Sequence, residues 1–292
     1  GENRSELLAA DWNGEWMRLQ ADRRRADDSF EWDKRARHFR PLETAPYARD
    51  FMKLLALEPD ESVLDMGCGA GSIAIPLAQA GHPVIAADFS PAMLGTLDAG
   101  IEYYGLEDLI TPLELAWDDD WDLVGPVAKT VDVAFASRSV TTNDLKGALA
   151  KLDRTARRRC AVTMVANSSP RYDLHLMNAI GASVTCSNGF VYAFNILIQM
   201  GALPQVTYFE SPRRDTFDSL EAGVADFSRM LEHGNEDKID RLRDYVAQHM
   251  IENPHAGEPG SKGVPQGRYM LDHVRKVRWA FIAWEPVSSG RP

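Results

Sequence analysis

The stretch SVLDMGCGAGSIAIPLAQAGHPVIAADFSPA, residues 62–92, decides the fold of this 292-residue chain. Apolar runs flank a glycine-rich turn and a segment with helical spacing, which indicates a strand, a turn, a helix and a second strand. Glycine suits the turn because the backbone must reverse sharply, with positive φ angles that other residues rarely adopt. We therefore predict a βαβ unit, with its four parts at residues 63–66, 67–71, 72–80 and 84–87.

Two acidic residues end the strands of this unit. Asp65 lies just before the turn, and Asp88 follows the second strand, 21 residues after Gly67. An acid at about that offset binds ribose hydroxyls in nucleotide-binding βαβ units. The glycine spacing differs from the GxGxxG of dinucleotide sites, no phosphate-binding loop ending in Gly-Lys-Ser or Gly-Lys-Thr is present, and no Lys or Arg lies near the turn. The pattern favours a ligand with a ribose and an ammonium group but no phosphate.

Strands and helices alternate at short spacing beyond this unit, which predicts an open, doubly wound, mostly parallel sheet covered on both faces. Pro112 indicates an edge position for the strand that contains it. We expect the arginine run 157–159 to lie on a solvated face or at a helix end. The expected strands are 110–116, 131–136, 160–165, 205–210 and 274–284, and the expected helices are 4–28, 33–39, 46–57, 91–104, 145–156, 171–180, 190–200, 219–232 and 238–250.

The chain length and the helical patterns suggest additions to the sheet domain. We predict a helical N-terminal extension at residues 1–58 and a Rossmann-like domain at 59–292, with a helical insertion at 211–270. Both helical segments are amphipathic, and residues 253–268 form a loop rich in Gly and Pro. We predict that the two segments meet over the carboxyl ends of the strands as a lid.

Composition limits the partners and the location. The net charge of −11 disfavours a broad nucleic-acid surface, so we expect no DNA partner. The three cysteines are far apart and form no paired ligand motif, which fits a reducing compartment and predicts no metal site. The N-terminal residues contain no apolar signal-peptide core, and the longest apolar stretch, residues 190–203, contains Asn195 and Gln199. We expect a cytoplasmic protein with no membrane partner.

At the glycine turn and the second strand the chain resembles the class I S-adenosylmethionine-dependent methyltransferases. VLDMGCGAGSIAIPLA is similar to the family's first motif, an acid followed by GxGxG, and VIAADFSPAML is similar to its second. The resemblance covers residues 60–165 well and the rest loosely. It implies a seven-stranded sheet in which the last strand is antiparallel to the others, and it implies S-adenosylmethionine (S-adenosyl-L-methionine) as the cofactor.

The resemblance also implies roles for single residues. Asp65 would act on the ammonium group of the methionine part, Asp88 would accept both ribose hydroxyls, and Asp118 would accept from the adenine amino group. For Phe89, Met93 and Trp117 a role in packing alone is the alternative. The cofactor-binding residues implied in this way are Asp65, Gly67, Cys68, Gly69, Gly71, Asp88, Phe89, Ser90, Met93, Trp117, Asp118 and Ser137.

No catalytic motif is visible in the sequence. This fits methyl transfer, because a sulfonium methyl is already activated and positioning the acceptor does most of the work. Arg138 follows the fourth strand, where it could hold an acidic group of the substrate or pair with a nearby acid. The same strand end lacks the Asn/Asp-Pro-Pro-aromatic motif of DNA-base methyltransferases. By residue type alone, His38, Tyr47, Tyr103 and His175 are candidate bases, although a lone histidine is more often structural.

Three functions are compatible with these residues. The first is methyl transfer to a small molecule, which could be acidic, and the second is methyl transfer to a protein or RNA. The third is a non-catalytic protein that binds the cofactor. The sequence leaves the acceptor, the attacked atom and the oligomeric state open.

Overall fold

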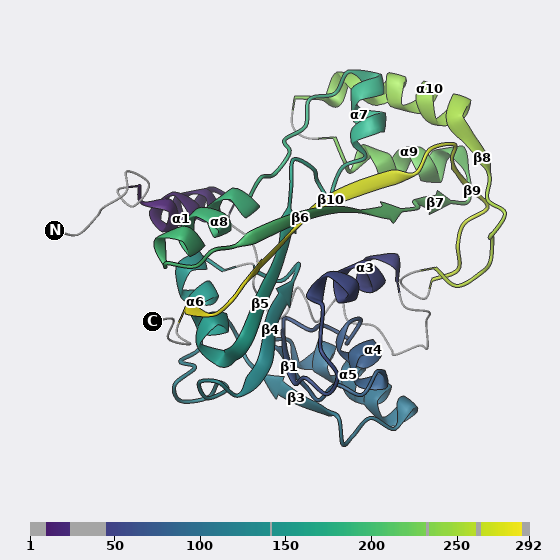
Figure 1. Cartoon of the computed structure of the whole chain (residues 1–292). Helices are drawn as coiled ribbons and strands as arrows, with labels where there is room; N and C mark the ends of the chain where they lie inside the picture. The colour runs from purple at the N-terminus through teal and green to yellow at the C-terminus, as the bar shows by residue number, and fades with distance from the viewer. Residues whose placement is uncertain (1–9, 24–44, 141, 232–233, 261–263, 288–292) are drawn as a thin grey trace.

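The computed structural model describes residues 10–23, 45–140, 142–231, 234–260 and 264–287. At its centre lies a seven-stranded sheet in the order β3-β2-β1-β4-β5-β10-β6 (Figure 1). Strands β1 to β5 are parallel, and β10 runs antiparallel to both of its neighbours. This is the predicted sheet with an antiparallel last strand. The strands are β1 (Val63–Met66), β2 (Val84–Asp88), β3 (Ile110–Glu114), β4 (Val131–Ser137), β5 (Ala156–Val165), β6 (Gln205–Arg213) and β10 (Arg275–Trp284).

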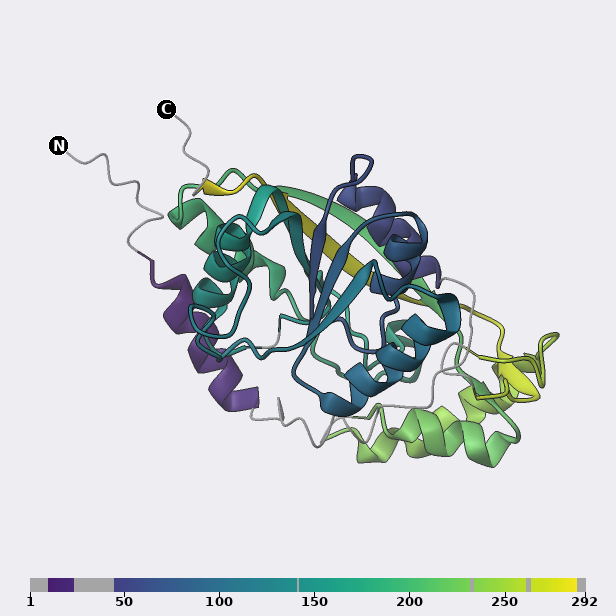
Figure 2. The same ribbon diagram turned by 90° about the horizontal axis from the view of Figure 1, so that it is seen from below.

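Helices cover both faces of this sheet, as Figures 1 and 2 show. Side chains alternate across each strand, so Leu64 and Met66 enter one apolar cluster while Val63 enters another. The first cluster packs against α1 (Trp12–Arg23), α6 (Leu145–Thr155) and α8 (Phe190–Gln199). The second packs against α3 (Pro46–Leu55), α4 (Ala74–Gln79) and α5 (Pro91–Tyr104).

A third apolar cluster lies beyond the ends of β6 and β10 (Figure 1). It includes Met177, Phe217, Phe227, Leu242 and Leu271, all nearly inaccessible to solvent. Its elements are α7 (Leu174–Ile180), β7 (Thr216–Phe217), α9 (Leu220–Ser228), η2 (Glu236–Lys238), α10 (Ile239–His249), β8 (Met250–Glu252) and β9 (Tyr269–Leu271), and the strands form a small sheet in the order β7-β9-β8. The helices of the insertion were predicted but its strands were not, because strands of two or three residues show no measurable alternation.

Most predicted elements are present, with shifted ends. The strand containing Pro112 lies at the sheet edge, as predicted. The helix predicted at 33–39 lies outside the described residues, as do residues 24–44 that would connect α1 with α3, so the lid stays a prediction. No helix among the described residues is long and apolar enough to cross a membrane.

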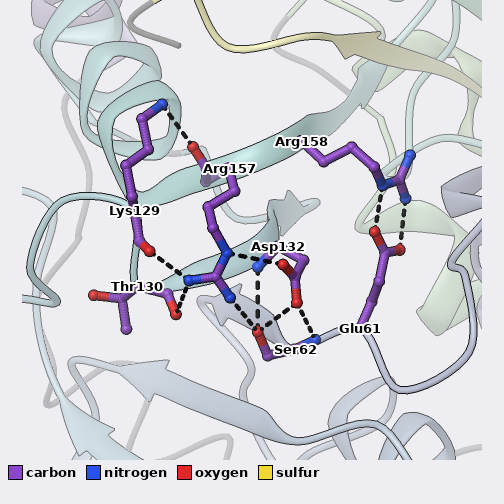
Figure 3. Close-up of polar contacts among 8 residues, drawn as sticks. Glu61, Ser62, Lys129, Thr130, Asp132, Arg157 and Arg158 are labelled. Atoms are coloured by element: carbon purple, nitrogen blue, oxygen red, sulfur yellow. Dashed lines mark hydrogen bonds and ion pairs between the residues drawn. The ribbon is translucent and has the colours of Figure 1, made fainter.

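The arginine run 157–159 lies inside β5, which begins four residues earlier than predicted. Of the two expected places, the helix end is wrong, whereas Arg157 is exposed as expected for a solvated face. Arg157 donates from Nε to Asp132 Oδ1 at 2.8 Å. Its Nη1 donates to the backbone carbonyls of Lys129 and Thr130, in the loop before β4. Asp132 Oδ2 accepts from the backbone N and the Oγ of Ser62, both at 2.9 Å. Arg158 forms a two-point contact with Glu61 (Figure 3). These contacts join the starts of β1, β4 and β5, so the arginines hold the sheet at its amino edge.

The Asp132 network predicts a pH-dependent contribution to stability. Hydrogen bonding from Arg157 lowers the pKa of Asp132 to about 2, below its ordinary value of 3.8. A depressed folded-state pKa gives stability that is present above the ordinary value and is lost as the pH falls toward 2. We expect Asp132→Asn to reduce the free energy of unfolding by about 1 kcal/mol at pH 7. This difference from the wild type should narrow between pH 5 and pH 3 in urea titrations.

The exposed pair Asp122–Arg154 offers a matched control. Asp122→Asn removes the same charge from a side chain that is 77% exposed, and it should change the free energy of unfolding by less than about 0.5 kcal/mol. An Asp132→Asn effect that does not vary with pH would contradict the assignment.

Candidate functional site

The glycine turn lies at the carboxyl end of β1. All three of its glycines have positive φ, but the space around them differs. Their φ angles are 79°, 55° and 87° for Gly67, Gly69 and Gly71. A Cβ on Gly67 would lie 2.3 Å from Ser139 Cβ, and a Cβ on Gly71 would lie 2.5 Å from Leu97 Cδ1. A Cβ on Gly69 would meet nothing within 4 Å. Packing therefore explains Gly67 and Gly71, whereas Gly69 presents bare backbone to open space.

Asp88 connects this turn to the loop after β2. Its Oδ2 accepts from the backbone N of Gly69 at 2.8 Å, and its Oδ1 accepts from the backbone N of Ser90 at 2.9 Å. Ser90 in turn caps α5 by accepting from the backbone N of Met93 at 3.2 Å. These contacts hold the Asp88 carboxylate between the turn and the start of α5.

Asp65 is a buried carboxylate with an unsatisfied oxygen. Its side chain is 2% exposed, and Oδ2 has no hydrogen-bond partner among the described residues. Burial raises the pKa of Asp65 to about 8, with a further increase from the nearby charge of Asp88, while Arg138 opposes the shift. A buried polar group without a partner is costly, so a cation or a donor supplied by a ligand would stabilise this carboxylate.

A second polar group lies at the carboxyl ends of β4 and β5. The hydroxyl of Tyr47, on α3, lies 2.7 Å from Ser137 Oγ and 2.6 Å from Thr163 Oγ1. Tyr47 is 4% exposed, and burial raises its pKa although Arg138 partly offsets the effect. A hydroxyl with a raised pKa is a poor base, so Tyr47 is better suited to holding the two strand ends in place.

Arg138 leaves β4 with a φ of 59°, which is unusual for a residue other than glycine. Its backbone N donates to Thr163 Oγ1 at 3.0 Å. Its guanidinium carbon lies 3.8 Å from the centre of the Tyr47 ring and 5.9 Å from that of Trp279. No acid among the described residues forms an ion pair with Arg138, so its charge is held by aromatic faces at an exposed position.

The loop after β3 packs against Ser139, the residue whose side chain lies against Gly67. Trp117 donates from Nε1 to the carbonyl of Ser139 at 2.9 Å and stacks on Trp121 at 5.6 Å between ring centres. Ser139 Oγ donates to the carbonyl of Met66 at 2.5 Å. Asp118 is exposed and accepts from Thr142 Oγ1 at 3.3 Å. Ser139 was not among the predicted site residues, because its role depends on a contact between distant parts of the chain.

The other predicted residues divide into those near the turn and those far from it. Phe89 and Met93 are half-buried beside Asp88, and neither enters the three apolar clusters of the described residues. Burial raises the pKa of the Cys68 thiol, which makes it unreactive. Among the candidate bases, Tyr103 is 62% exposed and contacts the Tyr104 ring edge-on. His175 lies on α7 with its ring tilted toward that of His273, 4.4 Å between ring centres, and His38 lies outside the described residues.

Comparison with known proteins assigns the residues around this site to a protein family. Residues 63–159 match the model of a methyltransferase domain. An uncharacterized protein of Haemophilus influenzae is 32% identical over 262 residues, which cover 87% of this chain and 88% of that protein. Over residues 63–159 the chain belongs to the methyltransferase domain family, and its sheet has the class I fold.

Solved structures resemble this methyltransferase in fold. The YcgJ protein of Bacillus subtilis is 13% identical and has a TM-score of 0.51, with 82% of this chain and 97% of that chain covered. A precorrin-6y C5,15-methyltransferase of Geobacter metallireducens is 12% identical, with a TM-score of 0.49 and coverage of 84% and 92%. At 13% identity the likeness to the Bacillus subtilis structure shows the fold and carries nothing about the acceptor.

The contact between Gly67 and Ser139 predicts unequal effects of two alanine substitutions in this methyltransferase. Gly67→Ala meets the Ser139 side chain at a positive φ, so we expect it to cost roughly 2–3 kcal/mol of unfolding free energy. Gly69→Ala has only its positive φ against it, and should cost about 1 kcal/mol. Urea unfolding of both variants measures the difference.

A second substitution separates the two causes. Ser139→Gly should recover part of the stability lost in Gly67→Ala, because it removes the Cβ and Oγ atoms that the new methyl group would meet. It should recover nothing in Gly69→Ala. Equal costs for the two alanine variants would contradict a steric contact between a side chain at residue 67 and Ser139.

Proposed function

We propose that the chain transfers a methyl group from S-adenosylmethionine to a small-molecule acceptor. The single observation that carries the proposal is the buried carboxylate of Asp65, unsatisfied at Oδ2, beside the bare backbone of Gly69. An ammonium group next to Asp65 would supply the missing partner. The match to a methyltransferase domain over residues 63–159 supports the choice of cofactor.

The residues around the turn suit the rest of this cofactor. Asp88 is held beside the turn, where its carboxylate would accept the two ribose hydroxyls, and the open space at Gly69 would allow the ligand to approach the backbone. Phe89 and Met93 lie half-buried beside Asp88 and would contact the adenine, while the exposed Asp118 would accept from its amino group.

Catalysis in this proposal depends on position. The cofactor supplies a sulfonium methyl that is already activated, so the chain must hold an acceptor atom in line with it and exclude water. Tyr47, Ser137 and Thr163 fix the carboxyl ends of β4 and β5 by their hydrogen bonds. Arg138 is held against Tyr47 at the same edge and meets the acceptor side of the site.

An acceptor of small size fits the burial of the groups at this edge. Tyr47 and Asp65 are nearly inaccessible, which suits a molecule that enters beside them rather than an extended polymer lying across the surface. The net charge of −11 also disfavours RNA as the acceptor.

Two measurements test the function. Isothermal titration with S-adenosylhomocysteine should show binding, and absence of binding would contradict the assignment of the cofactor. Incubation of the enzyme with methyl-labelled S-adenosylmethionine and an extract of the source organism should place the label in the fraction of small molecules. Label in the protein or RNA fraction would contradict the acceptor class and favour a macromolecular substrate.

The raised pKa of Asp65 predicts that cofactor binding releases a proton. At pH 7 a carboxyl with a pKa of about 8 is mostly protonated, and an adjacent ammonium group favours its charged form. S-adenosylhomocysteine should therefore release close to one proton at pH 7, and should bind more tightly as the pH rises from 6 to 8. Titration in buffers of different ionisation enthalpy counts the protons.

The matched ligand for this measurement is 5′-methylthioadenosine, which has no ammonium group and should release none. Asp65→Asn should abolish the release with S-adenosylhomocysteine. Equal proton release by both ligands would show that Asp65 does not face the ammonium group.

A further inference from the structure

Three arginines lie on one face of the sheet, next to the proposed methyl-transfer site. Arg213 on β6 and Arg275 on β10 are directly opposite in register, and Phe209 is opposite Trp279 four residues further along. Residues four apart on a strand share a face, and Tyr47 contacts both Phe209 and Trp279. Arg138 stacks on the same Tyr47 ring, so the three guanidinium groups belong to one surface.

The positive charge on this surface exceeds the negative charge beside it. Arg275 is nearly fully buried, pairs with Asp215 at 3.2 Å and donates from Nη2 to the carbonyl of Pro170. Its Nε is buried without a hydrogen-bond partner among the described residues. Arg213 donates to the carbonyl of Pro170 at 3.2 Å and forms no ion pair within the described part of the chain. Arg213 and Arg275 line a small pocket together with two acids, Asp215 and Asp173. Asp173 is bound through Oδ2 to His273 Nε2 at 2.6 Å.

This arrangement is unfavourable without a further partner. Like charges directly opposite on neighbouring strands repel, and taking a guanidinium out of water adds to the cost. Burial lowers the pKa of Arg213, and the nearby charges of Arg275 and Arg138 lower it further. Such a cluster in a chain of net charge −11 is what an anion-binding site requires.

We propose that the methyl acceptor carries an anionic group, a carboxylate or a phosphate, and that Arg213 and Arg138 bind it with Arg275 supporting them. The planar fork of an arginine matches either anion with two parallel hydrogen bonds. Arg138 is close enough to Asp65 to affect its titration, so the bound anion would hold the rest of the acceptor beside the proposed methyl donor. This inference rests on the proposed function.

The test uses the full chain saturated with S-adenosylhomocysteine and titrates it with inorganic phosphate, with succinate and with uncharged succinamide. We expect one of the two anions to bind and succinamide not to bind, and the anion that binds identifies the acceptor group. Arg213→Gln should weaken the binding of that anion about tenfold, as expected for the loss of a charge-assisted hydrogen bond.

Arg278→Gln is the matched control. Arg278 is also on β10, but it points to the opposite face and pairs with Glu210 at 3.2 Å, so its loss should leave anion binding unchanged. Both variants should bind S-adenosylhomocysteine as the wild type does, which shows that they are folded. The inference is overturned if neither anion binds better than succinamide, or if both variants lose the same affinity.

The two proposals fail separately. If S-adenosylhomocysteine binds and the anions do not, the proposal of an anionic acceptor is wrong, while S-adenosylmethionine remains the proposed methyl donor. If S-adenosylhomocysteine does not bind, the proposed function is wrong, and the same titrations on the free protein still decide whether the arginine surface binds anions.

Discussion

The candidate site depends on the carboxylate of Asp88. Its two oxygens hold the backbone N–H groups of Gly69 and Ser90, and therefore connect the turn after β1 to the start of α5. Without Asp88 the backbone N–H of Gly69 would lose its hydrogen-bond acceptor, and the turn would no longer be held in place at that residue. The same carboxylate also raises the pKa of Asp65, so one side chain both shapes the turn and adjusts the charge of its neighbour. An acid at the end of β2 is thus structural before any ligand arrives.

Charge at this edge of the sheet is arranged in two parts. Around the turn, Asp65 and Asp88 form an acidic part, and Asp65 stays mostly protonated near neutral pH because it is buried. On the neighbouring face, Arg138, Arg213 and Arg275 form a basic part with Asp215 as its paired acid. A molecule with a cationic end and a second molecule with an anionic end would each meet a complementary surface, and Arg138 lies where the two surfaces join.

Local patterns predicted much of this fold, because the features that decide it are short-range. The glycine turn, the flanking apolar runs and the acid after β2 all lie within residues 62–92, and the structure has the predicted βαβ unit there. The number of strands and the antiparallel direction of the last one came from the family resemblance, and β10 agrees with it. The small sheet β7-β9-β8 was missed, since two- and three-residue strands carry no periodic signal.

The contacts that sequence reading missed all join residues far apart in the chain. Ser139 explains why residue 67 must be glycine, yet the two are 72 positions apart. Arg157 and Arg158 pair with Asp132, at the start of β4, and Glu61, just before β1. Charge runs predict solvation, but they do not show which acids are near. The cross-strand pairing of Arg213 with Arg275 depends on register alone, and register becomes visible only when β10 is placed beside β6. The proposed acceptor side is built from such pairings, whereas most of the proposed cofactor side comes from one continuous stretch, which is why sequence predicts the second more readily than the first.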